Sequence, residues 1–186
     1  MALAAERGWR RIALADIAAA AGVPMTELYA RFPSKLAVLH ALGRQADIAA
    51  AVGAQDGAGE RPRDRLFDIV MRRLEALRPH RAGLRAAMRD LRCDPLAGLV
   101  SAPRLARSLR WMLEAAGLDT AGFAGMARVK ALGVGYAATL ATWLEDESPD
   151  MSATMARLDR MLRRVDGWTH LFGGDEPAAQ GDASPP

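Results

Sequence analysis

The sequence predicts an all-α protein on the basis of three observations. Alanine, leucine, arginine and methionine are abundant while β-branched residues are few, which favours helices over sheets. Apolar residues recur at spacings of three and four, and we find no stretch that alternates in the manner of a half-buried strand. Glycine, proline and aspartate interrupt the apolar stretches at short intervals. We therefore expect a series of helices joined by short turns.

The composition is that of an ordinary soluble globular protein. Of the 186 residues, 51% are hydrophobic and 25% are charged, and the net charge is +3. These values exclude disordered and collagen-like proteins, and no apolar run approaches the roughly 20 residues that a membrane span needs. The single cysteine, Cys93, cannot form an internal disulfide or a zinc site. The N-terminal residues lack the order of a signal peptide, so we expect a cytoplasmic protein.

The first 53 residues are predicted to form a helix-turn-helix unit. A short helix ends at Gly8, and two further short helices cover Leu14 to Ala21 and Met25 to Phe32. The last two are joined by a three-residue turn that contains Gly22, which is typical of a helix-turn-helix. Ser34 is expected to cap a third helix that runs towards residue 52.

The rest of the chain is predicted to form a larger helical domain. The polar, glycine-rich run 55–61 is the best candidate for a domain boundary, so we expect domains at 1–53 and 62–172. The tail 173–186 has too few apolar residues to pack and is expected to be disordered. The helices expected in the larger domain cover 62–77, 81–92, 104–116, 120–145 and 149–172, with an irregular helical stretch between Pro95 and Pro103, and with Ser148 as the cap and Pro149 in the first turn of the last helix.

An ordered series of residues runs through 6–42 without a gap, namely Gly8, Asp16-Ile17-Ala18, Ala21-Gly22-Val23, Leu28-Tyr29, Phe32 and Ser34-Lys35. This series resembles the DNA-binding domain of the TetR family of bacterial regulators. The resemblance implies a homodimer formed through the last two long helices. It also implies a small ligand held in the C-terminal domain, and release from the operator when that ligand binds. We therefore expect a DNA-binding transcriptional regulator of the TetR type, acting as a repressor on a double-stranded operator.

The second helix of the helix-turn-helix is the one expected to enter the major groove. The early residues of such a helix read base edges, while side chains around it bind phosphates. We expect Met25, Thr26 and Glu27 to contact bases, because threonine or methionine can contact a thymine methyl and a carboxylate can accept from cytosine N4. Tyr29 and Lys35 are the candidates for phosphate contacts. The alternatives are that Tyr29 belongs to the core and that Lys35 is a solvated charge.

Three residues depart from the family pattern, and each weakens the predicted DNA affinity. Ala13 stands where the family commonly has a threonine that caps the helix and binds phosphate, and Pro24 stands where a serine is common. Glu27 replaces a threonine and carries a charge that phosphates repel. Residues 1–48 hold 6 basic and 4 acidic side chains, so we expect few phosphate contacts and a shallow salt dependence.

The last two predicted helices carry apolar seams at near-heptad spacing, which is typical of helices that pair. Two copies of the chain would bury these seams in a four-helix interface, and the alternative is packing within one chain. The residues expected at the dimer interface are Tyr136, Leu140, Trp143, Met151, Met155, Leu158, Leu162 and Val165.

Nine methionines are many for a chain of this length. Flexible thioethers suit a cavity that adapts to apolar ligands, although they equally fill irregular cores. Together with neighbouring aromatic residues, they predict a pocket for an unidentified small apolar ligand. The residues expected to line this pocket are Phe67, Met71, Met88, Trp111, Met112, Phe123 and Met126.

A second series lies near the C-terminus, namely the helix face from Tyr136 to Trp143, then Asp146, Ser148-Pro149, Thr154 and Leu158-Asp159-Arg160. It is similar to the TetR-fold accessory proteins of ubiquinone biosynthesis. That similarity implies an alternative function, in which the chain binds an isoprenoid lipid and a partner enzyme and has lost operator binding. Residues 60–110 hold 13 basic and 6 acidic side chains, which suits either an anionic membrane surface or plain solvated helix faces.

No residue pattern predicts an enzyme, a cofactor or a metal site. The glycine pattern that begins at Gly133 lies in a predicted helix and follows no strand, so it is not a dinucleotide-binding fingerprint. The acidic residues from Glu145 to Asp150 precede a helix N-terminus, where negative charge is favourable without a metal. The three histidines lack the paired spacing of metal ligands.

Overall fold

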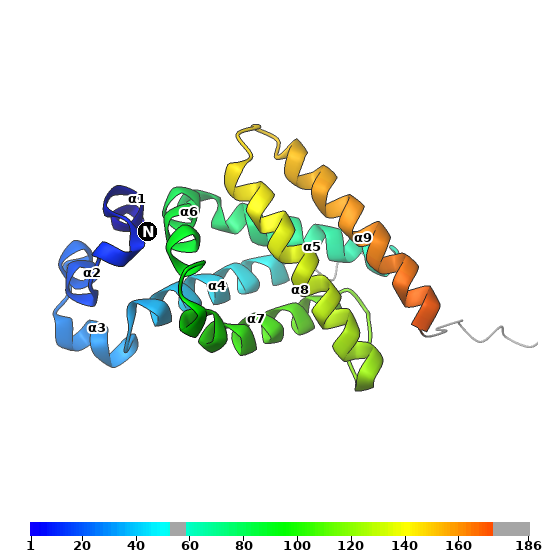
Figure 1. Cartoon of the computed structure of the whole chain (residues 1–186), viewed down its shortest axis with the longest axis horizontal. Helices are drawn as coiled ribbons and strands as arrows, with labels where there is room; N and C mark the ends of the chain where they lie inside the picture. Colours follow the sequence, from blue (N-terminus) through cyan, green and yellow to red (C-terminus); the bar gives the residue numbers. More distant parts are fainter. Residues whose placement is uncertain (53–58, 173–186) are drawn as a thin grey trace, which may run out of the picture.

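The computed structural model describes residues 1–52 and 59–172, with the backbone alone over 165–172. Within these ranges the regular elements are helices, which confirms the all-α prediction (Figure 1). Part of the predicted boundary and the whole predicted tail lie outside the described residues. The elements are α1 (Ala2–Arg7), the 3-10 helix η1 (Trp9–Arg11), α2 (Leu14–Ala21), α3 (Met25–Arg31), α4 (Lys35–Ala51), α5 (Pro62–Leu77), the 3-10 helix η2 (Arg78–His80), α6 (Arg81–Leu91), α7 (Pro95–Ala115), α8 (Gly122–Glu145) and α9 (Ser152–Phe172).

Local signals in the sequence set the bounds of the helix-turn-helix. α2 ends at Gly22, whose φ of 67° lies in the left-handed region that glycine adopts at little cost. At the start of α2, Asp16 accepts a hydrogen bond from the backbone amide of Ala13 at 2.7 Å, which is one half of a capping box; Ala13 has no polar side chain that could supply the other half. Ser34 accepts from the backbone amide of Ala37 at 3.1 Å and so caps α4, as predicted.

The N-terminal helices are anchored on α6, a contact between residues far apart in the sequence. α1 and η1 both pack against α6 (Figure 1). The residues buried in this small apolar cluster are Ala4, Trp9, Ile12 and Ala87. Gly83 of α6 lies so close to the backbone of Met1 that a β-carbon at this position would collide with the Met1 carbonyl. The absence of a side chain at residue 83 therefore permits the close approach of α1 to α6.

The main apolar core lies between α4, α5, α7, α8 and α9. α8 and α9 lie side by side, and α4 packs along α5 (Figure 1). Ala46 and Ala50 in the second half of α4 are buried in this core, and Leu39 and Leu42 pack against it. α4 therefore belongs both to the N-terminal unit and to the core of the larger domain.

A buried arginine connects four of these helices. Arg73 of α5 donates through Nε to Asp47 Oδ1 of α4 at 2.7 Å, and through Nη1 to the hydroxyl of Tyr136 on α8. Ser108 of α7 donates to the same Asp47 oxygen at 2.7 Å. Burial alone would lower the pKa of Arg73, but its interactions with Tyr136 and Asp47 outweigh burial and raise that pKa. Burial raises the pKa of Tyr136, so its phenol is neutral at physiological pH.

The apolar seams of α8 and α9 pack against each other within one chain. The buried members are Tyr136, Trp143, Met151, Leu158 and Leu162, and the half-buried members are Leu140 and Met155. The prediction that the buried members form the dimer interface was wrong, because side chains enclosed within one chain have no surface left for a second. A heptad seam indicates that two helices pair, but not whether the partner belongs to the same chain. The side chain of Val165 lies outside the described residues.

Residues 95–115 form one continuous helix, α7, where we expected an irregular stretch followed by a helix. Pro103 lies inside it and cannot donate to the carbonyl of Leu99. Both residues are exposed, so water can satisfy the carbonyl that lacks its helical partner. Asp94 caps the start of α7 by accepting from the backbone amide of Ala97 at 2.9 Å.

The turn between α8 and α9 is organised by Asp146. Its carboxylate accepts from the backbone amide of Thr154 at 2.8 Å and from the Thr154 hydroxyl at 2.6 Å, and also from the amide and hydroxyl of Ser148. Burial alone would raise the pKa of Asp146, but these hydrogen bonds hold that pKa well below its usual range. α9 begins at Ser152, so Pro149 precedes the helix, contrary to the prediction that it lies in the first turn.

We predict that Asp146→Ala lowers the free energy of unfolding by about 2 kcal/mol near pH 7, because four donors lose a charged acceptor. The pKa of Asp146 is lower in the folded chain, so its contribution is present above the unfolded pKa of about 4 and is lost as the pH falls through the folded pKa. The difference between wild type and variant in urea unfolding should therefore be constant between about pH 5 and 8 and shrink below about pH 4. Exposed Glu147→Ala is the control, and an equal loss in that variant would contradict the role of Asp146.

Candidate DNA-binding surface

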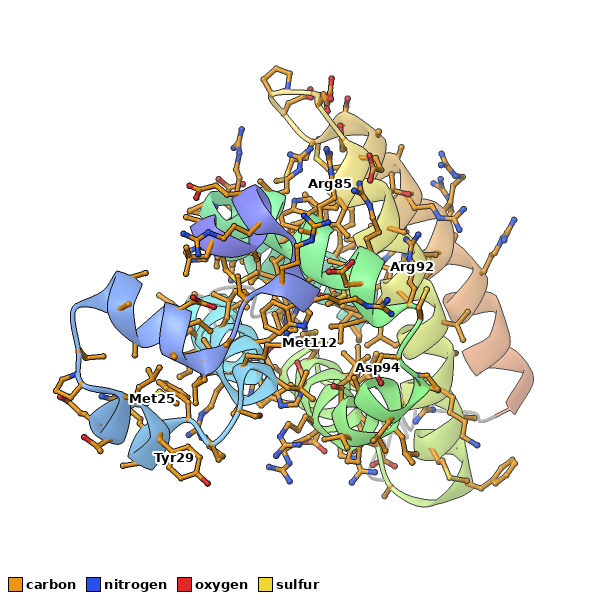
Figure 2. All side chains as sticks on the ribbon, turned by 60° about the vertical axis from the view of Figure 1, so that its left-hand side comes forward. Met25, Tyr29, Arg85, Arg92, Asp94 and Met112 are labelled. Carbon is orange, nitrogen blue, oxygen red and sulfur yellow. The ribbon has the colours of Figure 1, made fainter. Side chains whose placement is uncertain are left out.

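α3 presents an exposed face at one end of the molecule. Met25 and Tyr29, which are one helical turn apart, are 41% and 59% exposed, and Figure 2 shows both on α3, remote from the buried Met112. Thr26 and Glu27 are exposed as well. The structure thus brings four of the five predicted DNA-binding residues together on the surface of one short helix. Tyr29 is a surface residue, so the alternative that it belongs to the core is wrong.

The packing beneath this face is thin. Leu28 of α3 and Ala18 of α2 are buried, whereas Ile17, Val23 and Phe32 are only half-buried. Because so little apolar area is enclosed by α2 and α3 themselves, their position depends on contacts at the ends of the helices.

Lys35 makes one of these end contacts. Its Nζ donates to the backbone carbonyls of Trp9 at 2.7 Å and Ile12 at 3.0 Å, and lies 3.5 Å from that of Arg10. The ammonium also lies 5.3 Å from the centre of the Trp9 ring, within the range of a cation–π interaction. All three protons of the ammonium are therefore directed at η1 and the residue after it. Lys35 is neither the free phosphate ligand nor the solvated charge that we expected, and it fastens the start of α4 to η1.

Other cations near the helix-turn-helix are more accessible. Arg10 and Arg11 on η1 and Arg31 at the end of α3 are exposed, and none has an ion-pair partner among the described residues. Arg7 lies 3.8 Å from Asp16 in an exposed pair, which holds it only weakly. Three arginines are thus better placed than Lys35 to meet phosphates.

The residues predicted to line a ligand pocket are dispersed. Met112 is fully buried, whereas Phe123 is 82% exposed and Met126 is 43% exposed on α8, so the prediction was wrong for the last two. An apolar side chain that lies beyond the end of the core has the same sequence pattern as one that lines a cavity. The half-buried members are Phe67, Met71, Met88 and Trp111. All four of these, unlike Phe123 and Met126, pack against the main core.

An open groove of about 590 Å³ lies between α5 and α9. Its lining residues are Glu60, Arg63, Asp64, Phe67, Asp68, Met155, Ala156 and Asp159. Of the predicted pocket residues, Phe67 alone contributes to it. The groove is predominantly acidic and therefore does not match the apolar pocket that the methionines predicted.

The acidic residues around Asp146 serve the α8–α9 turn. Nowhere in the described ranges do three His, Cys, Asp or Glu side chains gather in a group that could hold a metal ion. In the described part of the chain, every helix is too short or too polar to span a bilayer.

The N-terminal helices and the overall fold both have known counterparts. Residues 1–42 match the family model described as "Bacterial regulatory proteins, tetR family". The chain thus has a TetR-type N-terminal domain within a TetR-like fold. A TetR transcriptional regulator from Nitrosomonas europaea ATCC 19718 superposes with a TM-score of 0.71 at 25% identity, over 89% of this chain and 92% of that one. A TetR transcriptional regulator from Rhodococcus sp. RHA1 superposes with a TM-score of 0.63 at 20% identity, over 88% of each chain.

These comparisons concern the TetR fold and its N-terminal domain. No curated protein matches the sequence significantly. Neither the family model nor the two structures named above points to ubiquinone-biosynthesis proteins, so the second sequence similarity gains no support from them. Three of the residues that carried that similarity, Asp146, Ser148 and Thr154, are explained by the structure of the α8–α9 turn.

We predict that Lys35→Met lowers the free energy of unfolding by about 2 kcal/mol, because the carbonyls around η1 lose a charged donor. Thermal or urea unfolding of the whole chain measures the effect. Arg31→Met, which removes an exposed charge from the same unit, is the control and should shift stability by no more than about 0.5 kcal/mol. Lys35→Met with unchanged stability but weaker DNA binding would restore Lys35 as a direct phosphate ligand.

Proposed function

We propose that this chain is a TetR-type repressor that binds a palindromic operator as a homodimer and is released by a small apolar ligand. The observation that carries the proposal is the exposed face of α3, on which Met25, Thr26, Glu27 and Tyr29 are accessible within a TetR-type domain. Residues 1–53 act as the DNA-binding domain in this proposal, and 62–172 as the ligand-binding and dimerisation domain.

The chemistry of the exposed α3 residues suggests how they would divide the work of recognition. Met25 and Thr26 offer apolar contact to thymine methyl groups, and Glu27 is suited to accept from a cytosine amine. The Tyr29 hydroxyl would bind a phosphate and set the register of the helix in the groove. Arg31 and the exposed arginines of η1 would supply the counter-charge that Lys35, engaged with backbone carbonyls, does not.

A second stripe of α8, apolar except for Lys130 and called the α8 stripe below, supports the homodimer. Phe123, Ala127, Lys130, Val134, Ala137 and Ala141 follow one another at spacings of four and three. The first five are exposed, Phe123 at 82% and Val134 at 76%. Small residues at this spacing allow a second helix to approach closely. The α8 stripe lies on the helix pair farthest from α3 (Figure 1), which leaves both copies of α3 free to reach DNA. We propose that it replaces the buried seam as the surface that meets the second copy.

The half-buried residues around Met112 support the apolar ligand. Met71, Met88 and Trp111 lie on α5, α6 and α7 and contact the same core as α4. A ligand that enters between these helices would have to displace flexible methionine side chains, which adapt at low cost. Because α4 shares that core, a rearrangement there would reach the helix-turn-helix without a separate linker.

The proposal is tested by selecting high-affinity duplexes from random DNA with the wild-type chain and measuring binding by fluorescence anisotropy. We predict that Met25→Ala weakens the selected site by about tenfold and relaxes the base preference, because it removes a base contact. Tyr29→Phe should weaken all sequences alike, since it removes a phosphate contact. Exposed Ile48→Ser on α4 is the control and should bind as wild type does.

Sedimentation of the free protein accompanies this measurement, and a dimer is expected. The proposal fails if the selection enriches no sequence, or if Met25→Ala and Tyr29→Phe bind the selected site as tightly as wild type does.

A further inference from the structure

The first three turns of α7 stand outside the core. Leu96 and Leu99 are 68% and 71% exposed, and Val100 is 44% exposed. The first buried residue of α7 is Ser108, more than half-way along the helix. Large aliphatic side chains that remain in water over three turns of an otherwise ordinary helix indicate a surface that is covered in some other state of the protein.

These residues share one face. Leu96, Leu99, Val100 and Pro103 follow the spacing i, i+3, i+4 and i+7, which places them along a single line on a helix. We call this set the α7 stripe. Its opposite side carries Ser101, whose hydroxyl is 2.9 Å from His40 Nε2 of α4. The stripe is therefore a convex ridge of aliphatic side chains directed away from the protein.

Both ends of the α7 stripe are positively charged. Five exposed arginines lie there and have no ion-pair partner among the described residues. They are Arg89 and Arg92 before the stripe, and Arg104, Arg107 and Arg110 after it. The two acids nearby are engaged, since Asp94 caps α7 and Asp90 accepts from the backbone amide of Arg10 at 2.8 Å. Figure 2 shows Arg92 and Asp94 where α6 gives way to α7.

This charge pattern selects the kind of surface that could cover the stripe. A second copy of α7 would place arginines at one or both ends against arginines, which opposes self-association. Nucleic acid has the opposite charge but offers no apolar surface to the leucines along its backbone. An anionic bilayer offers both an apolar interior for the leucines and phosphate groups for the arginines on either side.

We propose that the α7 stripe docks on an anionic lipid membrane, with its aliphatic side chains in the interfacial region and its flanking arginines on the lipid phosphates. A ridge needs no matching groove in a fluid bilayer, and the stripe lacks the aromatic residues that anchor most protein–protein interfaces. The stripe lies on neither α3 nor the α8 stripe, so this docking does not use the surfaces proposed for the operator and for the dimer.

The test is co-sedimentation of the whole chain with vesicles of equal parts phosphatidylglycerol and phosphatidylcholine, and with vesicles of phosphatidylcholine alone. Wild type should bind the anionic vesicles at least about tenfold better, and the difference should shrink as salt rises. The double variant Leu96→Ser/Leu99→Ser should lose about tenfold or more of that binding, because it removes the apolar part of the contact. The double variant Arg104→Gln/Arg107→Gln should lose the preference for anionic lipid.

Exposed Ile48→Ser on α4 is the matched control for removing surface apolar area, and it should bind vesicles as wild type does. All variants alter exposed side chains, and their melting temperatures and operator affinity should match wild type. The proposal is overturned if wild type ignores the anionic vesicles, or if the leucine variant binds them as well as the control. It is also overturned if the leucine variant has a lower oligomeric state than wild type, because the stripe would then join copies of this chain. Binding of a protein to the stripe that vesicles cannot displace would likewise overturn it.

Discussion

The arrangement of the larger domain depends on one charged side chain. The guanidinium of Arg73 is enclosed in the core and binds the carboxylate of Asp47 and the hydroxyl of Tyr136, while Ser108 completes the coordination of the same carboxylate. An arginine is stable in such a place only when its donors are matched, because an unpaired buried charge costs several kcal/mol. The positions of α4, α5, α7 and α8 relative to one another are therefore specified by a polar contact as well as by apolar packing.

Through this contact, α4 is a structural part of both units of the chain and not a linker between them. Asp47 lies on the same helix as Lys35, and each residue holds α4 at a different end. Lys35 fastens the start of α4 to η1, whose Trp9 is buried on α6, while Asp47 fastens its second half to α5. The core around α5, α7 and α8 is thus connected through α4 to η1 of the helix-turn-helix unit. The regulatory function that we propose for the chain requires such a connection.

Local chemistry made much of the fold predictable from the sequence. Gly22, Ser34 and Pro62 mark helix ends that the structure reproduces, because turns and caps depend on neighbouring residues alone. Long-range partners were not predictable. The apolar seam that contains Leu158 packs within the chain, because the spacing of apolar residues does not show which helix they will contact. Lys35 binds backbone carbonyls, and the identity of a residue does not show which backbone groups will lie near its side chain. The sequence predicts Met25, Thr26 and Glu27 as base contacts, and the structure leaves all three exposed on α3.

Arg73 and Asp47 hold α4 to the larger domain, and a double-mutant cycle measures how strongly they do so. Arg73→Met, Asp47→Asn and the double variant are compared with wild type by urea unfolding. We predict a coupling of about 2 kcal/mol between the two residues, because each single variant leaves the other charge without its partner. Additive effects of the two substitutions would contradict it, since they would show that α4 is held by apolar packing alone.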